Sequence, residues 1–393
     1  MANDSKKLKI VYLTPALYMA GGVERVLTLK ANYFAEHFGY DITIVLTEGK
    51  DKPLFYPLSD KIKTVNLDIG FEQLWTCSFM KKIFVYMKKQ HQYRRKVKAF
   101  LMETKPDVMV SLLRREINFI TSIHDGSRKI GEMHINRANY RNFDADSNVL
   151  KRMFSKLWMH NLVGKLRRLD RLVVLTEKDR EAWTELNNVE VIPDPLPFTP
   201  RQTSRQTEKR VVAVARYSHE KGIDLLLKAW KHTDTDWRLD VFGDGDRTPY
   251  EELIEQLNID RSRCQLHPRT NDVEREYCGS SLFVLSSRFE GFGMVMTEAM
   301  ACGLPVVAFD CPWGPRSIIR NGEDGLLAEN GDTAALAKAM ERLMSDDTLR
   351  RRMSQAAKTN VQRFSTERVA QMWQKVYETV TNSKQNDNNS CEK

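Results

Sequence analysis

Two glutamates eight positions apart, Glu290 and Glu298, lie in the chemically richest segment of the sequence, RFEGFGMVMTEAMACGLPVVAFD. The apolar run SLFVLSS before it predicts a strand, and the residues after Gly293 predict a helix. A carboxylate on that helix can accept both hydroxyl groups of a ribose. The amides at the helix start can meet a phosphate, which leaves Glu290 facing a sugar.

Two further segments follow predicted strands and could contact an anion. Arg216 and Lys221, the latter followed by Gly222, come after RVVAVAR, and two cations there can neutralise a diphosphate that departs with extra negative charge. Gly21 and Gly22 come after KIVYLT, where glycines let the backbone approach a phosphate at a helix start. Solvated surface charges and an ordinary turn are the alternatives.

Strands must alternate with helices to position these loops. Short apolar runs and longer helical patterns alternate in both halves, which predicts an α/β fold with two Rossmann-like, doubly wound parallel sheets. The proline-rich and polar stretch 192–208 between them predicts a linker. We expect an N-terminal domain over 1–195, joined by a C-terminal helix at about 366–382, and a second domain over 196–365. The polar end, 383–393, predicts a disordered tail.

With these motifs the chain resembles the family 4 glycosyltransferases of the GT-B architecture, in which two such domains face each other across a cleft. The resemblance rests on the Glu-x7-Glu segment, EAMACGLPVVAFD, GPRSII, GEDGLLAEN, RYSHEKG and AGGVERV. It covers nearly the whole chain and is most specific over residues 286–330. It implies transfer of a hexose or N-acetylhexosamine with retained configuration, without a metal or other cofactor. It also implies that the domain over 1–195 is the acceptor-side domain and that the domain over 196–365 binds the nucleotide-sugar.

The resemblance also assigns roles to single residues. His134, Glu290, Arg216 and Lys221 match catalytic positions: His134 and Glu290 near the donor sugar, and the two cations on the leaving diphosphate. For His134, a purely structural role is the alternative. Contacts with the nucleotide-sugar are expected from Gly21, Gly22, Arg216, Lys221, Glu290, Phe292, Gly293, Met294, Val295 and Glu298.

Three features depart from the family pattern. Ser317 stands where the family often has an acidic residue, Trp313 replaces a smaller residue, and LHPRTNDVEREY is an unusual form of the loop that binds the base. A uracil nucleotide is the expected donor nucleotide. The sequence does not name the sugar.

Two DxD triplets, Asp144/Asp146 and Asp244/Asp246, have the spacing of metal ligands in another glycosyltransferase class. Aspartate and glycine are also ordinary turn residues, and we expect turns here and no bound metal.

The positive charge of the chain is concentrated in its first half. Residues 1–190 hold 33 Lys and Arg against 22 Asp and Glu, whereas the remainder holds 28 against 30. Residues 81–98 hold eight basic side chains and no acid. Residues 151–171 hold seven basic side chains and one acid. One apolar helical face of this segment consists of Phe154, Leu157, Trp158, Leu162, Leu166 and Leu169. Such faces bind anionic membranes or pack on their own sheet.

Composition places the protein among globular chains, with 41% hydrophobic and 29% charged residues. Six cysteines without metal-ligand spacing predict buried thiols in a reducing compartment. We therefore expect a cytoplasmic enzyme, peripheral on the inner face of the membrane, that acts on a glycan or a polyprenyl- or other lipid-linked glycan. The alternatives are a sugar-nucleotide epimerase or phosphorylase on the same scaffold, or a nucleic-acid-binding protein. No nucleic-acid-binding motif supports the last.

Overall fold

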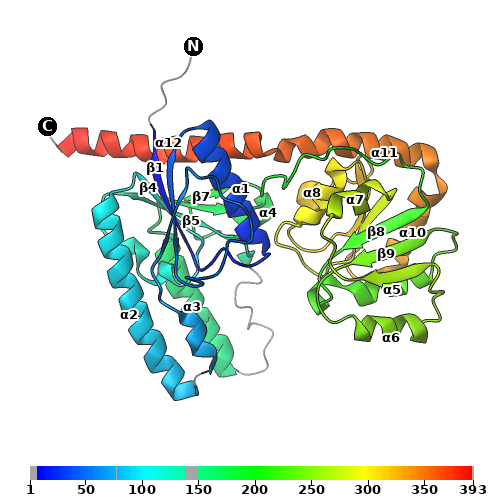
Figure 1. Ribbon diagram of the computed structural model, residues 1–393, viewed down its shortest axis with the longest axis horizontal. Helices are drawn as coiled ribbons and strands as arrows, with labels where there is room; N and C mark the ends of the chain where they lie inside the picture. The colour runs from blue at the N-terminus through cyan, green and yellow to red at the C-terminus, as the bar shows by residue number, and fades with distance from the viewer. Residues whose placement is uncertain (1–6, 77, 138–148, 392–393) are drawn as a thin grey trace, which may run out of the picture. The chain divides into compact units, whose positions relative to one another are not determined.

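Two compact units make up the chain (Figure 1). A computed structural model describes residues 7–76, 78–137 and 149–391. Unit 1 comprises Met1–Pro195 and Thr366–Lys393, and unit 2 comprises Leu196–Ser365. Each unit contains one parallel sheet with helices on both of its faces, as the alternation of strand and helix patterns in the sequence predicts.

The sheet of unit 1 has seven parallel strands in the order β3-β2-β1-β4-β5-β6-β7. Their bounds are β1 Lys9–Thr14, β2 Asp41–Leu46, β3 Lys63–Asn66, β4 Val108–Ser111, β5 Arg128–Glu132, β6 Arg171–Val174 and β7 Val189–Val191. The central strand β1 is buried on both faces, and Ile10 pairs with Ile42 on one side and with Val108 on the other. The chain order reverses between β1 and β4, and this reversal defines the topological switch point of the sheet.

Helices cover both faces of this sheet. They are α1 Gly22–His37, α2 Phe79–Thr104, α3 Val149–Leu166, α4 Glu177–Ala182 and α12 Thr366–Cys391. One face packs on α1 and α12, through side chains that include Trp373 and Tyr377, and the other packs on α2 and α3. The expected disordered tail is wrong as far as Cys391, because α12 continues to that residue. The segment has no proline or glycine to stop a helix that has already formed.

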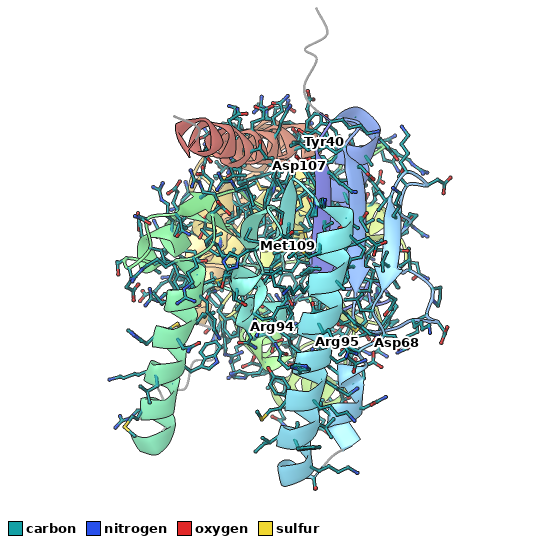
Figure 2. All side chains as sticks on the ribbon, turned by 90° about the vertical axis from the view of Figure 1, so that its left-hand side faces the viewer. Tyr40, Asp68, Arg94, Arg95, Asp107 and Met109 are labelled. Atoms are coloured by element: carbon teal, nitrogen blue, oxygen red, sulfur yellow. The ribbon has the colours of Figure 1, made fainter. Side chains whose placement is uncertain are left out.

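The first halves of α2 and α3 extend past the edge where the strands of unit 1 end. Figure 2 shows this, with Asp107 at the start of β4 on the opposite edge and Arg94 and Arg95 along α2. Large apolar side chains are exposed on these halves, namely Ile83 46%, Phe84 72%, Met87 66%, Met153 56% and Leu157 66%. The first halves of these two helices thus present apolar side chains among basic ones.

Unit 2 contains a six-stranded parallel sheet in the order β10-β9-β8-β11-β12-β13. Its strands are β8 Arg210–Val214, β9 Arg238–Phe242, β10 Cys264–His267, β11 Leu282–Leu285, β12 Val306–Phe309 and β13 Gly325–Ala328. Its helices are α5 Ile223–Lys231, α6 Thr248–Gln256, α7 Val273–Cys278, α8 Met294–Ala301, α9 Pro315–Ile318, α10 Thr333–Ser345 and α11 Asp347–Asn360. The chain order reverses between β8 and β11, so the switch point lies where these two strands end.

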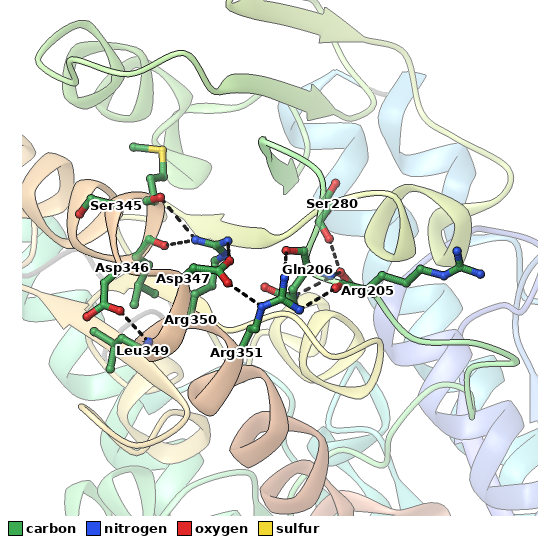
Figure 3. A network of polar contacts seen from close by, with 12 residues as sticks. Arg205, Gln206, Ser280, Ser345, Asp346, Asp347, Leu349, Arg350 and Arg351 are labelled. Carbon is green, nitrogen blue, oxygen red and sulfur yellow. Dashed lines mark hydrogen bonds and ion pairs between the residues drawn. The ribbon is translucent and has the colours of Figure 1, made fainter.

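The first residues of unit 2 are held by side chains and do not behave as the free linker that the sequence predicts for 192–208. Arg351 on α11 donates to the carbonyls of Arg205 and Gln206, each at 3.4 Å (Figure 3). Its Nε also donates to Asp347 Oδ2 at 2.7 Å. Ser204 Oγ donates to the carbonyl of Ser280 at 2.5 Å. Polar composition predicts a linker here, but several of these polar groups are bonded within the unit.

Candidate functional site

An ion pair marks the switch point of unit 2. Lys221 follows β8 and Glu290 follows β11, and Lys221 Nζ lies 2.7 Å from Glu290 Oε1. The side chains are 20% and 7% exposed, so the pair is largely shielded from water. Ser287 Oγ donates to the same carboxylate oxygen at 2.6 Å and fixes its position. The sequence places both charged residues at this edge, and the structure brings them into contact.

The turn that carries Lys221 requires a glycine. Gly222 has a φ of 62°, and a Cβ there would lie 2.1 Å from the carbonyl oxygen of Ser286. This close approach locks the turn after β8 against the turn after β11. Arg288 reinforces the contact, because its guanidinium binds both carboxylate oxygens of Asp224 at 2.8 Å. The two loops of the switch point therefore form one rigid piece.

Arg216 is placed differently from Lys221. Its side chain is 69% exposed, and it pairs with Glu220 at 3.2 Å. Exposed pairs of this kind contribute little to stability, so the guanidinium can leave Glu220 at small cost. The two cations predicted for a diphosphate thus comprise one fixed ammonium and one exposed guanidinium.

Helix α8 begins directly beside the Lys221–Glu290 pair. Gly293 caps it with a φ of 96° and no side-chain cap, so the first amides of the helix are open to a ligand. Glu298 lies further along the helix, only 4% exposed, and accepts a hydrogen bond from the Tyr277 hydroxyl at 3.0 Å. A carboxylate has several acceptor positions on its two oxygens, so it can accept hydrogen bonds from more than one hydroxyl group.

The remaining residues of the predicted segment divide into packing and backbone roles. Phe292 is 3% exposed, and its ring packs edge-on against Phe364 with centroids 5.4 Å apart. A Cβ at Gly314 would lie 2.4 Å from the carbonyl oxygen of Phe292. The GPRSII motif therefore packs directly behind the turn that holds Glu290. Met294 and Val295 are half-buried in the first turn of α8.

The departures from the family pattern lie in the same region. Trp313 adopts a φ of 85°, which is uncommon for a residue other than glycine. Ser317 Oγ donates to the carbonyl oxygen of Trp313 at 3.1 Å, so the serine stabilises this turn. The strained backbone sits one residue before the glycine that contacts Phe292.

Comparison with known proteins agrees with this geometry. Residues 198–360 match the family described as Glycosyl transferases group 1. The chain is 28% identical over 374 residues to an uncharacterized glycosyltransferase of Haemophilus influenzae, covering 93% of this chain and 98% of that one. Residues 198–360 therefore form a domain similar to those of the group 1 glycosyltransferases.

Other relatives of this glycosyltransferase match along their whole length. It is 25% identical over 400 residues to the Campylobacter jejuni enzyme named GalNAc-alpha-(1->4)-GalNAc-alpha-(1->3)-diNAcBac-PP-undecaprenol alpha-1,4-N-acetyl-D-galactosaminyltransferase, covering 96% of this chain and all of that one. A crystal structure of a variant of S. aureus TarM, in complex with fondaparinux, alpha-GlcNAc-glycerol and UDP, has a TM-score of 0.71 at 17% identity. The alignment covers 94% of this chain and 99% of TarM, and it supports the fold.

Two site residues predicted for the first unit of the glycosyltransferase lie at the start of α1. Gly21 is the N-cap residue and Gly22 is the first helical residue. A Cβ at Gly21 would lie 1.9 Å from Glu24 Oε2, so the Glu24 carboxylate covers this glycine. An acidic group thus stands where a phosphate would bind, and the loop suits a ligand rich in hydroxyl groups better than an anion.

His134 follows β5 at the carboxyl edge of the same sheet. Its imidazole lies between two carboxylates, with Nε2 3.2 Å from Glu132 Oε1 and Nδ1 3.4 Å from Asp194 Oδ1. Burial favours the neutral ring, but the two carboxylates outweigh it and raise the pKa of His134 to about 9. The histidine predicted near the sugar is therefore a cation at neutral pH.

The two DxD triplets have different outcomes. Asp144 and Asp146 lie outside the described residues. Asp244 accepts from the Gly245 amide at 3.0 Å, and Asp246 accepts from the Thr248 amide at 3.0 Å. Both are bonded within their own turn, as turn residues are. Within the described ranges no group of three or more His, Cys, Asp or Glu is arranged to hold a metal. Metal independence stays a prediction.

The sequence did not single out three residues of the site. Ser287 bonds Glu290, Tyr277 bonds Glu298, and Arg288 clamps the two loops. Ser287 immediately precedes the predicted segment and Arg288 is its first residue, so their position was the only signal. Tyr277 closes the loop segment LHPRTNDVEREY, where a hydroxyl-bearing aromatic residue gives no pattern of its own.

The apolar face predicted for 151–171 is divided in two. Leu162, Leu166 and Leu169 are buried in the core of unit 1, whereas Leu157 is exposed. The side chain of Phe154 lies outside the described residues. Among the described helices, none is both long enough and apolar enough to cross a bilayer. Cys264, Cys302 and Cys311 are buried free thiols, and Cys278 is partly exposed.

Proposed function

We propose that this glycosyltransferase binds a UDP-sugar in unit 2 and transfers the sugar, with retained configuration, to a glycan or lipid-linked glycan. The observation that carries the proposal is the shielded Lys221–Glu290 pair beside the open start of α8. Such an arrangement offers a cation and helix amides to a diphosphate and a carboxylate to the sugar that the diphosphate carries. A carboxylate on α8, Glu298, then binds the ribose.

The division of roles follows from the contacts. The Lys221 ammonium has three donors, so it can bind a phosphate oxygen while it keeps one bond to Glu290. Ser287 holds the carboxylate in place if the lysine turns away. Arg216, being exposed, adds charge to the leaving diphosphate. Positive charge from these groups and from α8 replaces a metal, so the proposal includes no cofactor.

The printed names of relatives support the choice of substrates. The Campylobacter jejuni relative is named for transfer of N-acetylgalactosamine to a diphospho-undecaprenol-linked glycan, and the TarM complex contains UDP. N-acetylhexosamines carried by UDP are therefore the first donors to test. The comparisons lend no support to an epimerase, a phosphorylase or a nucleic-acid-binding protein.

A lipid-linked acceptor also fits the exposed halves of α2 and α3. Phe84, Met87 and Leu157 are exposed there among lysines and arginines, at the edge where the strands of unit 1 end. Apolar side chains that insert and basic side chains that bind anionic lipid headgroups attach a protein reversibly to a membrane. We propose that this surface holds the enzyme on the inner face of the membrane, near its acceptor.

Thermal unfolding in the presence of single sugar-nucleotides tests the donor assignment. A ligand of the folded state raises the unfolding temperature with concentration. We expect UDP and one or more UDP-N-acetylhexosamines to stabilise the wild-type protein, and to stabilise the Glu298→Ala variant far less. Equal stabilisation by all nucleotides, or by none, would contradict the donor assignment.

A further inference from the structure

Four charged side chains form a chain of contacts in the core of unit 1. Lys30 on α1 places its Nζ 2.5 Å from both carboxylate oxygens of Glu132 on β5. Glu132 faces His134, and His134 faces Asp194, at the distances given above. The exposed fractions of these side chains are 1%, 3%, 7% and 9% in that order. We call these four residues, Lys30, Glu132, His134 and Asp194, the Lys30–Asp194 chain.

Charges alternate along the Lys30–Asp194 chain. With His134 protonated, two cations and two carboxylates balance, whereas a neutral imidazole would leave one buried negative charge uncompensated. An unpaired buried charge is strongly destabilising. Lys30 and His134 accordingly lower the pKa of Glu132 to about 2 against the opposing effect of burial. The arrangement selects the imidazolium form of His134.

Neighbouring groups add no competing charge. The hydroxyls of Tyr12 and Tyr377 lie 2.7 Å apart, and burial raises the pKa of each well above its usual value, so both stay neutral. The Lys30 ammonium lies 4.0 Å from the ring centroid of Trp373 and 5.5 Å from that of Tyr12. These aromatic faces stabilise the lysine cation, although burial lowers its pKa.

The contacts at His134 are ionic and leave hydrogen-bonding capacity. Within the described residues, neither His134 Nε2 nor Asp194 Oδ1 has a hydrogen-bond partner of good geometry. The ring is thus held between the two carboxylates mainly by charge. Asp194 stands between Pro193 and Pro195, which restrict the backbone that carries its carboxylate.

We propose that Glu132 and Asp194 are positioning residues that hold His134 as a fixed imidazolium at the carboxyl edge of the first sheet, with Lys30 anchoring Glu132. The proposal rests on the proposed function and on the catalytic position that the family resemblance gives His134. His134 then supplies a fixed positive charge at this edge of the sheet. It does not take a proton from the acceptor, because it carries one throughout the neutral range.

Titration of His134 by NMR, in protein labelled with ¹⁵N-histidine and without any donor or acceptor, tests the assignment. The His134 signal is identified by its loss in the His134→Gln variant. We expect the wild-type imidazole to titrate with a pKa of about 9. In Asp194→Asn and in Glu132→Gln the pKa falls by about 1 to 3, because each variant removes one facing carboxylate. In Lys30→Met it rises, because a nearby cation is lost.

The carboxylate variants lower the pKa of His134 and Lys30→Met raises it. A merely structural role of these residues would not produce shifts of opposite sign. Lys129→Met is the matched control, since Lys129 is a buried lysine on β5 that pairs with Asp125 and does not contact His134. It destabilises unit 1 but leaves the His134 titration unchanged. If Lys30→Met does not fold, the pKa of His134 in Asp194→Asn and in Glu132→Gln still tests the proposal. A wild-type pKa near the ordinary value, or one that neither carboxylate variant lowers, would overturn the proposal.

The pH dependence of transfer adds a second measurement. Wild-type turnover stays flat from pH 6 to 8, whereas turnover of Asp194→Asn declines across that range as its histidine loses the proton, with KM for the donor unchanged. A wild-type rate that rises through pH 6.5 as a general base deprotonates would contradict the proposal. If the NMR titrations hold but the protein turns over no sugar-nucleotide, the proposed function fails and the charge assignment stands.

Discussion

The carboxyl edges of the two sheets hold charged groups of different kinds. In unit 2, Lys221 and Glu290 sit on loops that meet at the switch point, and the neighbouring Arg216 is largely exposed. In unit 1, His134 ends a chain of charges that runs into the core as far as Lys30. The first arrangement can exchange partners when a ligand arrives. The second is fixed before any ligand binds.

The difference suggests a division of labour. Groups that must follow a diphosphate from bound donor to leaving product benefit from partners they can release at small cost. A group that must present constant charge benefits from burial and from two counter-ions. Substitutions in unit 2 should therefore change binding and turnover separately, and those in unit 1 should change the pH dependence.

The largest effect is expected at Glu290. Replacing it with glutamine keeps the size and removes the charge that faces the sugar, so turnover should fall by about a hundredfold to a thousandfold. Donor affinity should change little, because Glu298 and α8 remain. Steady-state kinetics with the donor found by thermal unfolding measures both. A rise in KM alone would mean that Glu290 only binds the substrate.

A smaller loss is expected from Glu298→Ala. A hydrogen bond to a charged group contributes roughly 1.5–3 kcal/mol, so affinity for UDP should drop about tenfold to a hundredfold. Isothermal titration with UDP measures this directly. Tyr277→Phe, which removes only the hydroxyl that bonds Glu298, serves as the matched control and should cost less. Unchanged UDP affinity in Glu298→Ala would show that Glu298 does not bind the ribose.

The membrane surface of unit 1 predicts a moderate effect. Phe84→Ser should weaken binding to anionic vesicles by about tenfold to a hundredfold, because a phenyl ring that inserts into the bilayer contributes about 1.5–3 kcal/mol. Met102→Ser is the control, since Met102 is 43% exposed on the same helix near its other end. Sedimentation with phosphatidylserine and with phosphatidylcholine vesicles measures both variants.

Charge should contribute to the same binding. Lys88, Arg94 and Arg95 are exposed on α2, whereas Lys89 donates to the carbonyl of Ile69 and is kept unchanged. Replacing the three with glutamine should weaken binding further and flatten its dependence on salt. The same change at Lys228, Lys338 and Arg352 of unit 2 should have no effect. Equal binding to neutral and anionic vesicles would contradict the proposal that the exposed halves of α2 and α3 bind anionic lipid.

No effect is expected from EDTA. Lys221, Arg216 and the amides of α8 supply the positive charge that a metal would bring, and Asp246 is bonded within its own turn. Turnover measured before and after chelation tests this. Loss of activity that manganese or magnesium restores would return Asp244 and Asp246 to consideration as ligands.

Central strands were predictable from the sequence, whereas the edge strands β3, β7 and β10 were not. β1 and β8 are continuous apolar runs because both of their faces are buried. β3, β7 and β10 are short, partly exposed edge strands such as KTVN and CQLH, which carry no such pattern. The amphipathic pattern of α3 predicted a helix correctly, but not that its first half extends beyond the sheet it packs on.

The two edges also differ in how far the sequence reveals them. Glu290, Glu298 and Lys221 lie in compact motifs, so their spacing carries information. The partners of His134 come from separate elements, and Lys30 and Glu132 are 102 positions apart. A lysine inside an amphipathic helix looks like any solvated lysine until the fold buries it. Long-range pairing of this kind has no local signature.

Helix α12 has a consequence for how the chain is made. Trp373, Val376 and Tyr377 complete the core of unit 1 although they follow the whole of unit 2 in the sequence. On the ribosome, all of unit 2 is synthesised before α12. The N-terminal unit lacks the part of its core that α12 supplies until these residues have been made. The unit that is synthesised first therefore completes its core after unit 2 has been synthesised, unlike domains that fold in the order of synthesis.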